Sequence, residues 1–345
     1  VNDERVIQVF VESTRDFFAN PASIHAEGQR GYRKLTLAHD NIAKLLNCPN
    51  HHIIITSGAT EANNLAIIGY CVEHLTRGKH IITTATEHPS VLEVVKKLCH
   101  KVGFEATYLE PNEEGVITVE QVKNAIRKDT CLVTIMAVNN ETGAVNPVNE
   151  IADMLKAYPK IAFHSDCVQA LGKIDIDYSK LDMFTVTGHK VHGLMGCGML
   201  AKRKQIELAP LFSGGGQELG FRSGTNDLAH TLAFEKTIEL ALQNRVAEFN
   251  QVMPLYLKLI TYLKSHLDLY ELNTYGENNP FIVNFSLLTK KASVVVEALS
   301  NEGIMVSSIS ACHSQKENYS YVVKAMKHNE SLAHNTIRVS FDSIN

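Results

Sequence analysis

Short apolar runs, many of them rich in valine, isoleucine and threonine, alternate with helical segments along the first 226 residues of this chain. The runs that we expect to form strands are 53–56, 80–84, 106–109, 131–138, 161–164, 183–186 and 198–201. Helical patterns lie between them, over 58–71, 89–100, 119–127 and 148–156. Strands that alternate with helices in this way form βαβ units. The sequence therefore predicts an α/β fold built on a largely parallel, doubly wound sheet.

The pattern changes after about residue 226. Two long helical stretches, 228–249 and 252–267, come first. Three β-rich runs (281–286, 304–308 and 336–341) then accompany two further helical patterns, 291–301 and 319–327. This arrangement is typical of a smaller α+β unit. We therefore expect a large α/β domain over 1–227 and a small α+β domain over 228–345.

The composition excludes several classes of protein. Lys+Arg 33 against Asp+Glu 37 gives a net charge of −4, so nucleic acid and anionic membranes are poor candidate partners. The longest apolar run lies within 131–138, far below the roughly 20 residues that cross a bilayer, and no signal-peptide pattern is visible. The seven cysteines are scattered without C-x-x-C spacing, and no histidine motif for a metal is present. We expect a cytoplasmic protein without a metal site.

Three predicted strands are followed at once by residues that could carry chemistry. Lys190 lies just after the run 183–186, where a desolvated lysine becomes an amine nucleophile for a Schiff base. Asp166 follows the run 161–164, and a buried carboxylate there needs a cationic partner such as a pyridinium nitrogen. Small residues and hydroxyls around Thr60 open a helix, as in a phosphate site. Each segment also has an ordinary explanation, as a loop lysine or a helix cap.

Two further segments stand out. The glycine run Gly214–Gly216 lacks the spacing and the preceding strand of a dinucleotide fingerprint, so a Rossmann dehydrogenase is rejected. Cys312 lies among small polar residues in a predicted loop, unlike most of the other cysteines, which lie in or beside apolar segments. A thiol in such a loop is exposed and reactive, although a loop cysteine without a function fits the same pattern.

Nine motifs in register extend this set from about residue 20 to residue 341. They are Asn20-Pro21-Ala22-Ser23, 56–64, Thr86-Glu87-His88, Asn139-Asn140-Glu141-Thr142-Gly143, 166–169, Gly188-His189-Lys190, 214–225, Ser310-Ala311-Cys312 and Ile337-Arg338-Val339-Ser340. In these motifs the chain resembles the cysteine desulfurases (NifS/IscS-like) of the class V aminotransferase family. The resemblance implies a fold-type I pyridoxal phosphate enzyme, with a mostly parallel seven-stranded sheet and a smaller C-terminal α+β domain.

The resemblance also implies a role for each site residue. Lys190 would hold pyridoxal 5'-phosphate covalently and move the α-proton of the substrate, and Cys312 would accept the sulfur. Asp166 would pair with the pyridinium nitrogen, and His88 would stack on the ring and assist proton transfer. The remaining contacts would be to the phosphate from Ala59, Thr60, Thr187, His189 and the Thr225 of a neighbouring subunit, to the phenolic oxygen from Gln169 and Asn140, and to the substrate carboxylate from Arg338, with Asn140 nearby.

The implied activity is that of a cysteine desulfurase. It would convert L-cysteine to L-alanine and leave a persulfide on Cys312, in a homodimer that passes sulfur to an iron–sulfur scaffold or a sulfur carrier, for cluster assembly or tRNA thiolation. Selenocysteine lyase is one alternative, because it shares the fold and most cofactor residues. A non-catalytic, cofactor-binding assembly scaffold is another, because the family's opening strand is not found before Asn20 and Leu194-Met195 stand where the family commonly has Pro-Lys.

Overall fold

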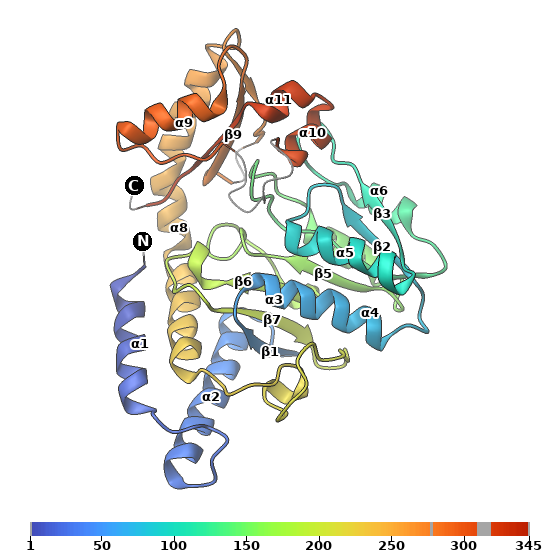
Figure 1. Ribbon diagram of the computed structural model, residues 1–345, viewed down its shortest axis with the longest axis vertical. Coiled ribbons are helices and arrows are strands. Elements are labelled where there is room, and N and C mark those ends of the chain that lie inside the picture. The colour runs from blue at the N-terminus through green and yellow to red at the C-terminus, as the bar shows by residue number, and fades with distance from the viewer. Residues whose placement is uncertain (1, 277–278, 309–318, 344–345) are drawn as a thin grey trace.

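A seven-stranded sheet forms the centre of the protein in the computed structural model, which describes residues 2–276, 279–308 and 319–343 (Figure 1). The strands are β1 (His51–Thr56), β2 (His80–Thr84), β3 (Glu105–Leu109), β4 (Thr130–Thr134), β5 (Ala162–Asp166), β6 (Met183–Thr187) and β7 (Gly198–Arg203). Their order is β1-β7-β6-β5-β4-β2-β3, and only β7 runs antiparallel to its neighbours. The predicted α/β fold with a mostly parallel sheet is confirmed.

Helices cover both faces of this sheet. One face packs against α3 (Ala59–Asn64), the π-helix Leu65–Gly69, α4 (Tyr70–Glu73) and α5 (Pro89–Val102). The other packs against α2 (Ala26–Leu45), α6 (Val119–Ala125), α7 (Val148–Leu155) and the first part of α8 (Leu228–Lys264). The strands β2, β4, β5 and β6 are buried along their whole length, as expected for parallel strands covered on both faces, and their polar residues are therefore buried as well.

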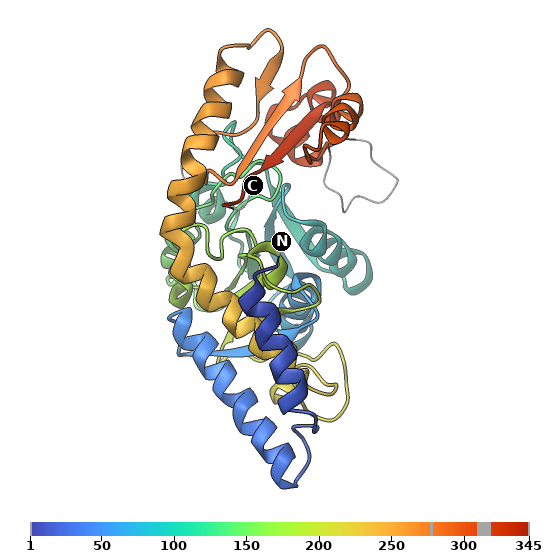
Figure 2. The same ribbon diagram turned by 90° about the vertical axis from the view of Figure 1, so that its left-hand side faces the viewer.

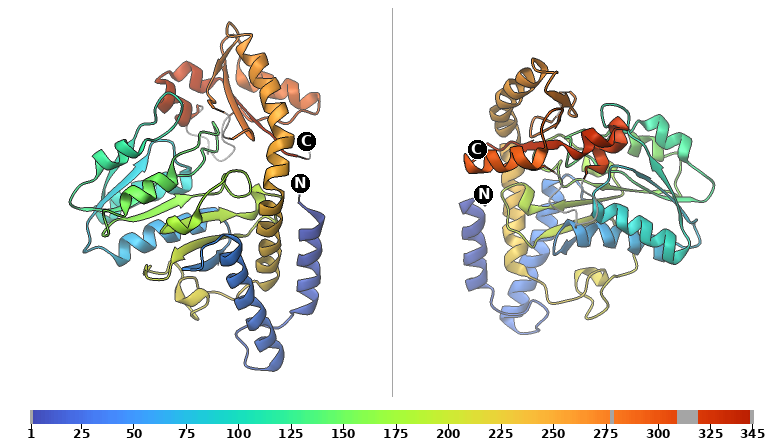
Figure 3. Two further views of the ribbon diagram at one scale, coloured as in Figure 1. Left: turned by 180° about the vertical axis from the view of Figure 1, so that it is seen from behind. Right: turned by 45° about the horizontal axis from the view of Figure 1, so that its top comes forward.

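The long helix α8 connects the two sheets of the protein. Near its start, Phe234 and Ile238 belong to the core of the large sheet, and near its end Tyr256 and Ile260 pack against the small sheet. Figures 2 and 3 show α8 running past both sheets, with α1 (Glu4–Asp16) alongside its first half. The sequence predicts two helices here, but α8 is continuous through Pro254. That expectation was wrong because packing on both sides of the proline outweighs its local effect.

The small sheet has the order β10-β9-β8 and is antiparallel. Its strands are β8 (Tyr270–Leu272), β9 (Ile282–Leu287) and β10 (Thr336–Ser340), accompanied by α9 (Ala292–Asn301), α10 (Tyr321–Lys327) and α11 (Glu330–His334). The predicted strand 304–308 is not formed, because only Ser307 pairs with β10, through Arg338. The division of the chain at residue 227 stays a prediction.

Two other expectations need correction. The strand predicted over 131–138 ends at Thr134, because the chain leaves the sheet there to form the loop that carries Asn139 and Asn140. The helices α1 and α2 were not predicted, although both lie along α8. Among the described residues, none of the helices combines the length and the apolar character needed to cross a bilayer.

Candidate active site

The carboxyl ends of the parallel strands bring the predicted residues to one edge of the large sheet. Asp166 is the last residue of β5, and Lys190 ends the 3-10 turn Gly188–Lys190 that follows β6. His88 follows β2 and caps α5, while the loop after β4 carries Asn140. In open α/β sheets, ligands bind outside this edge. The topology therefore explains why residues from four sequence motifs converge.

A cavity of about 220 Å³ lies at this edge, between the large and the small sheet. Five residues predicted for the site line it, namely Asn140, Gln169, His189, Lys190 and Arg338. The first four come from loops of the large sheet, and Arg338 comes from β10 of the small sheet. Lys190 is exposed in the single chain. The cavity can thus hold a ligand that contacts both parts of the protein.

Arg338 and Asn140 both line this cavity, and each has one polar atom that is unused within the described residues. The Nη1 of Arg338 donates to the backbone oxygen of Asn140 at 3.0 Å, which fixes the guanidinium beside the loop. Within the described part of the chain, the buried Nε of Arg338 and the buried Oδ1 of Asn140 have no hydrogen-bond partner. Buried polar atoms without partners are destabilising, so a polar ligand would stabilise this arrangement.

The orientation of Gln169 is set by a second lysine. The Nζ of Lys173 donates to Oε1 of Gln169 at 2.8 Å, and an ammonium group can only donate. The amide oxygen is therefore engaged, and the Nε2 hydrogens remain to bind an acceptor. Burial lowers the pKa of Lys173 to about 8, and the charge of Lys190 acts in the same direction.

Asp166 is buried at the end of β5, with 6% of its surface exposed. It accepts hydrogen bonds from the backbone of Val168 at 3.0 Å and from Nδ2 of Asn63 at 2.8 Å. The same Nδ2 donates to Oγ of Ser90, which lies 2.8 Å from Nδ1 of His88. A continuous line of hydrogen bonds thus joins the carboxylate to the histidine.

The residues predicted to bind phosphate come from two neighbouring segments. Thr187 donates to the backbone oxygen of Cys197 at 2.9 Å, so its Oγ1 can accept the Nδ1 hydrogen of His189 at 3.0 Å. Ala59 and Thr60 open the helical run 59–73, which lies beside β7. Their loop approaches the sheet so closely that a Cβ on Gly198 would lie 2.9 Å from backbone atoms of Gly58. Glycine is therefore required at position 198.

The loop that presents Asn140 is held by the side chain before it. Buried Asn139 accepts from the backbone of Glu141 and of Thr142 at 2.9 Å each, and donates to the backbone oxygen of Thr86 at 2.9 Å. This amide links the loop after β4 to the loop that carries His88.

We expect Asn139→Ala to lower the free energy of unfolding by about 3 kcal/mol, because it leaves several buried backbone groups without partners. Urea unfolding measures the change. Asn149→Ala is the matched control, since Asn149 makes two backbone hydrogen bonds, both with Asp177, at a half-buried position. An equal loss of stability in the two variants would contradict the role given to Asn139.

Five other predicted residues belong to the same edge of the sheet without lining this cavity, namely Ala59, Thr60, His88, Asp166 and Thr187, whereas Thr225 lies elsewhere. Thr225 is exposed and lines a separate cavity of about 720 Å³ beside Phe17 and Phe18. Its assignment to the site of a neighbouring subunit stays a prediction. Cys312 lies outside the described residues.

Sequence reasoning missed Asn63, Ser90 and Lys173. Each lies two to four residues from a predicted residue, at spacings that place side chains close together in helices and turns. That spacing was the available signal, but it does not tell which polar neighbours bond to one another.

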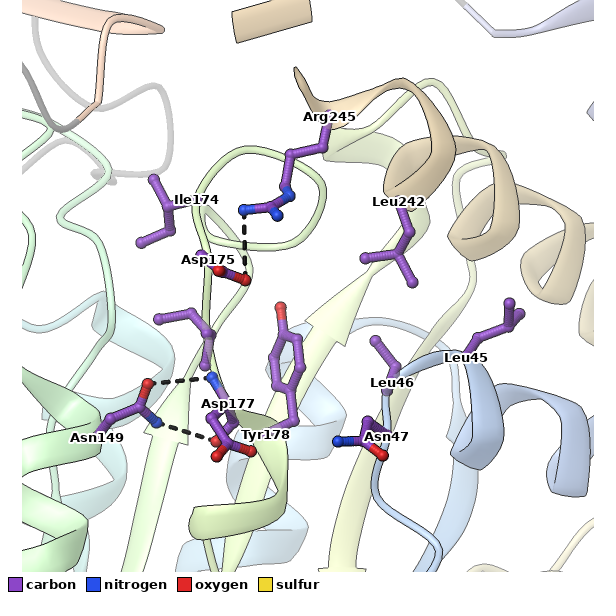
Figure 4. Close-up of a pocket in the computed structure, with 11 residues that line it drawn as sticks. Leu45, Leu46, Asn47, Asn149, Ile174, Asp175, Asp177, Tyr178, Leu242 and Arg245 are labelled. Atoms are coloured by element: carbon purple, nitrogen blue, oxygen red, sulfur yellow. Dashed lines mark hydrogen bonds and ion pairs between the residues drawn. The ribbon is translucent and has the colours of Figure 1, made fainter. Parts of the chain in front are cut away.

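A larger cavity, of about 520 Å³, lies elsewhere, between the end of α2 and the segment 174–178 (Figure 4). Its polar groups bind one another. The Nη1 of Arg245 lies 3.3 Å from Oδ1 of Asp175, and the amide of Asn149 bonds to the backbone of Asp177. Of the predicted site residues that the structure describes, none lines this cavity. The smaller cavity is therefore the candidate active site.

Comparison with known proteins agrees with this geometry. The profile of the family described as aminotransferase class-V matches residues 2–345. A protein of Dictyoglomus turgidum named cysteine desulfurase IscS is 37% identical over 330 residues, covering 94% of this chain and 82% of that protein. A solved structure named NIFS-LIKE PROTEIN has a TM-score of 0.90 at 31% identity, covering 100% of this chain and 92% of that one. Another, named SspA in complex with cysteine, has a TM-score of 0.83 at 32% identity, covering 99% and 95%. The chain therefore belongs to the class-V aminotransferase family.

Proposed function

We propose that this protein is a cysteine desulfurase, which removes sulfur from L-cysteine and releases L-alanine. The observation that carries the proposal is the cavity at the sheet edge, where the amine of Lys190 and the guanidinium of Arg338 line one space. An amine suits covalent binding of an aldehyde cofactor, and a guanidinium suits an amino-acid carboxylate. The relative named cysteine desulfurase IscS and the structure of SspA in complex with cysteine support the same conclusion.

The residues present fit pyridoxal phosphate, the cofactor of this family. Asp166 offers a buried carboxylate for a pyridinium nitrogen, and Gln169 offers amide hydrogens because Lys173 holds its oxygen. The unpartnered Oδ1 of Asn140 and Nε of Arg338 indicate that a polar ligand belongs in this cavity. When bound, this cofactor supplies an electron sink for negative charge at the α-carbon of an amino acid. Ala59, Thr60, Thr187 and His189 would hold its phosphate, with Thr225 of a neighbouring subunit.

Each residue of the chain would then have a separate role in the reaction. Lys190 would hold the cofactor and move the α-proton of the substrate through its Nζ. Arg338 binds the carboxylate of L-cysteine and so orients the amino acid. Asp166 would pair with the pyridinium nitrogen of the cofactor and favour its protonated form, and His88 would stack on the ring and carry protons.

Cys312 is the proposed sulfur acceptor. Its thiolate attacks the substrate sulfur, so that an S–S bond forms as the C–S bond breaks. The electron pair of the broken bond stays with the three-carbon product, which takes up protons and leaves as L-alanine. Cys312 keeps the sulfur as a persulfide for transfer to an acceptor protein, an iron–sulfur scaffold or a sulfur carrier. A homodimer and a cytoplasmic location remain predictions from the sequence.

The test is the release of L-alanine and sulfide from L-cysteine, with added pyridoxal phosphate and a reducing thiol. We expect equal amounts of the two products, and we expect Cys312→Ala to lose sulfide release because no persulfide can form. Cys99→Ala is the matched control, since Cys99 is a half-buried cysteine on α5. Full activity of Cys312→Ala would contradict the acceptor role. Cofactor binding without turnover of L-cysteine would contradict the activity and favour a scaffold, and faster turnover of L-selenocysteine would favour the lyase.

A further inference from the structure

The hydrogen bonds between Asp166 and His88 have a defined direction. A carboxylate can only accept, so the group of Asn63 that lies 2.8 Å from Oδ2 of Asp166 must be its Nδ2. The second hydrogen of that nitrogen points to Oγ of Ser90, 2.9 Å away. Exchanging the nitrogen and oxygen of Asn63 would place two acceptors against each other at Asp166. Ser90 therefore accepts from Asn63.

This direction continues to the histidine. Because Oγ of Ser90 accepts from Asn63, its own hydrogen is available for Nδ1 of His88, at 2.8 Å. The backbone N–H of Ser90 donates to the same Nδ1, at 3.2 Å. Turning the ring over would put a C–H group against both donors, so the ring orientation is fixed as well. Nδ1 of His88 is thus an acceptor only.

The helix that His88 caps also disfavours a hydrogen on Nδ1 of the ring. α5 has 14 residues, Pro89 at its first position has no N–H to donate, and His88 accepts from the next residue. The N-terminal end of a helix is positive, which opposes a second proton on the ring. A hydrogen on Nδ1 would also face the backbone hydrogen of Ser90, which cannot turn away. The neutral ring with its hydrogen on Nε2 is the form that satisfies these contacts.

We propose that Asn63 and Ser90 are positioning residues that hold His88 as the Nε2–H tautomer, so that His88 exchanges protons through Nε2. The proposal rests on the proposed function only for the use of that proton. These hydrogen bonds give Asp166 a second role. The carboxylate that would pair with the cofactor ring nitrogen also sets, through two hydrogen bonds, the tautomer of the residue that would stack on that ring.

Nitrogen NMR of the full chain, labelled with ¹⁵N-histidine, tests the tautomer directly, with and without pyridoxal phosphate. A His88→Gln spectrum identifies the signals of His88. We expect an unprotonated Nδ1 and a protonated Nε2 in the wild type. In Ser90→Ala we expect the Nδ1 signal to shift toward the protonated position, because only the backbone donor remains. A wild-type ring protonated at Nδ1 would overturn the proposal.

Kinetics of L-cysteine turnover supply the second readout. We expect Ser90→Ala to lower kcat about tenfold with KM unchanged, the effect of losing one hydrogen bond to a proton carrier. Ser90→Thr keeps the hydroxyl and should retain both the spectrum and the rate. Ser293→Ala is the matched control, since Ser293 holds the same second position in α9 but is exposed. Wild-type spectra and rates in Ser90→Ala would overturn the role of Ser90. A wild-type protein that has the expected tautomer but no desulfurase activity would contradict the proposed function and leave the assignment of the tautomer intact.

Discussion

Replacing Lys190 by alanine is expected to lower the turnover of L-cysteine by at least about 10⁴-fold, because the variant loses both the covalent attachment point and the group that moves the α-proton. The cavity contains a second lysine, which is the competing candidate for the attachment point of the cofactor. Lys173 lines the same space, and burial lowers its pKa from 10.5 to about 8, so it loses its proton more easily than an ordinary lysine does. The two lysines therefore need to be told apart by chemistry.

Geometry favours Lys190. Nζ of Lys173 is engaged with Oε1 of Gln169 at 2.8 Å and lies 5.9 Å from the ring centre of Phe281. Lys190 instead ends the turn after β6, in the segment that also provides Thr187 and His189. We thus expect Lys173 to orient the glutamine and Lys190 to bind the cofactor.

Borohydride reduction of the protein loaded with pyridoxal phosphate, followed by peptide mapping, measures which lysine carries the cofactor. The expected label is on the peptide with Lys190, and Lys190→Ala should remain unlabelled. Lys173→Met is the matched control. It should keep the label on Lys190 but bind the cofactor less tightly, because Gln169 is then free to turn its amide. A label on Lys173 in the wild type would reverse the two roles.

The sequence was sufficient to predict the site residues that lie at the ends of strands. Asp166 and Lys190 each follow an apolar run, and parallel strands deliver such positions to one edge of a sheet. The same logic predicted all seven strands of the large sheet, with errors at their ends. The continuity of α8 was not predictable, because Pro254 is a local signal for a break and the packing that overrides it comes from two distant sheets.

The line from Asp166 to His88 could not be predicted for a different reason. Asn63 and Ser90 are ordinary helix residues by type, and their roles depend on which atoms face one another across three separate segments. Sequence spacing brings Ser90 near His88, but only the structure shows that a carboxylate fixes the direction of every hydrogen bond between them. Local sequence patterns do not identify residues whose role is to position another residue of the site.

Glu87→Gln is expected to make the stability of the protein less dependent on pH. The wild-type side chain is fully buried, and its Oε2 has no hydrogen-bond partner in the described part of the chain. Burial raises the pKa of Glu87 from 4.5 to about 8, against the effect of the Met136 backbone N–H that donates to it. Between these two values the folded protein keeps a proton that the unfolded chain has released.

Folding therefore takes up a proton in that range, and the free energy of unfolding falls as pH rises, by about 1.4 kcal/mol per pH unit from this group. Glutamine keeps an acceptor for Met136 and does not titrate. The stability of Glu87→Gln relative to wild type should accordingly increase from pH 5 to pH 8, by about 4 kcal/mol in total, and level off above pH 8. A constant offset between the two proteins reflects only the packing of the amide, so the slope is the decisive quantity.

Urea unfolding at a series of pH values measures that slope. Glu93→Gln on α5, the helix that follows Glu87, is the matched control, since the side chain of Glu93 is 68% exposed and its ion pair with Lys96 lies at the surface. Its difference from wild type should be small and should not vary over this pH range. Parallel stability curves for wild type and Glu87→Gln between pH 5 and 8 would mean that Glu87 is already ionised in the folded protein. The folded protein would then hold two buried carboxylates, Glu87 and Asp166, and a buried carboxylate needs a cationic or hydrogen-bonding partner.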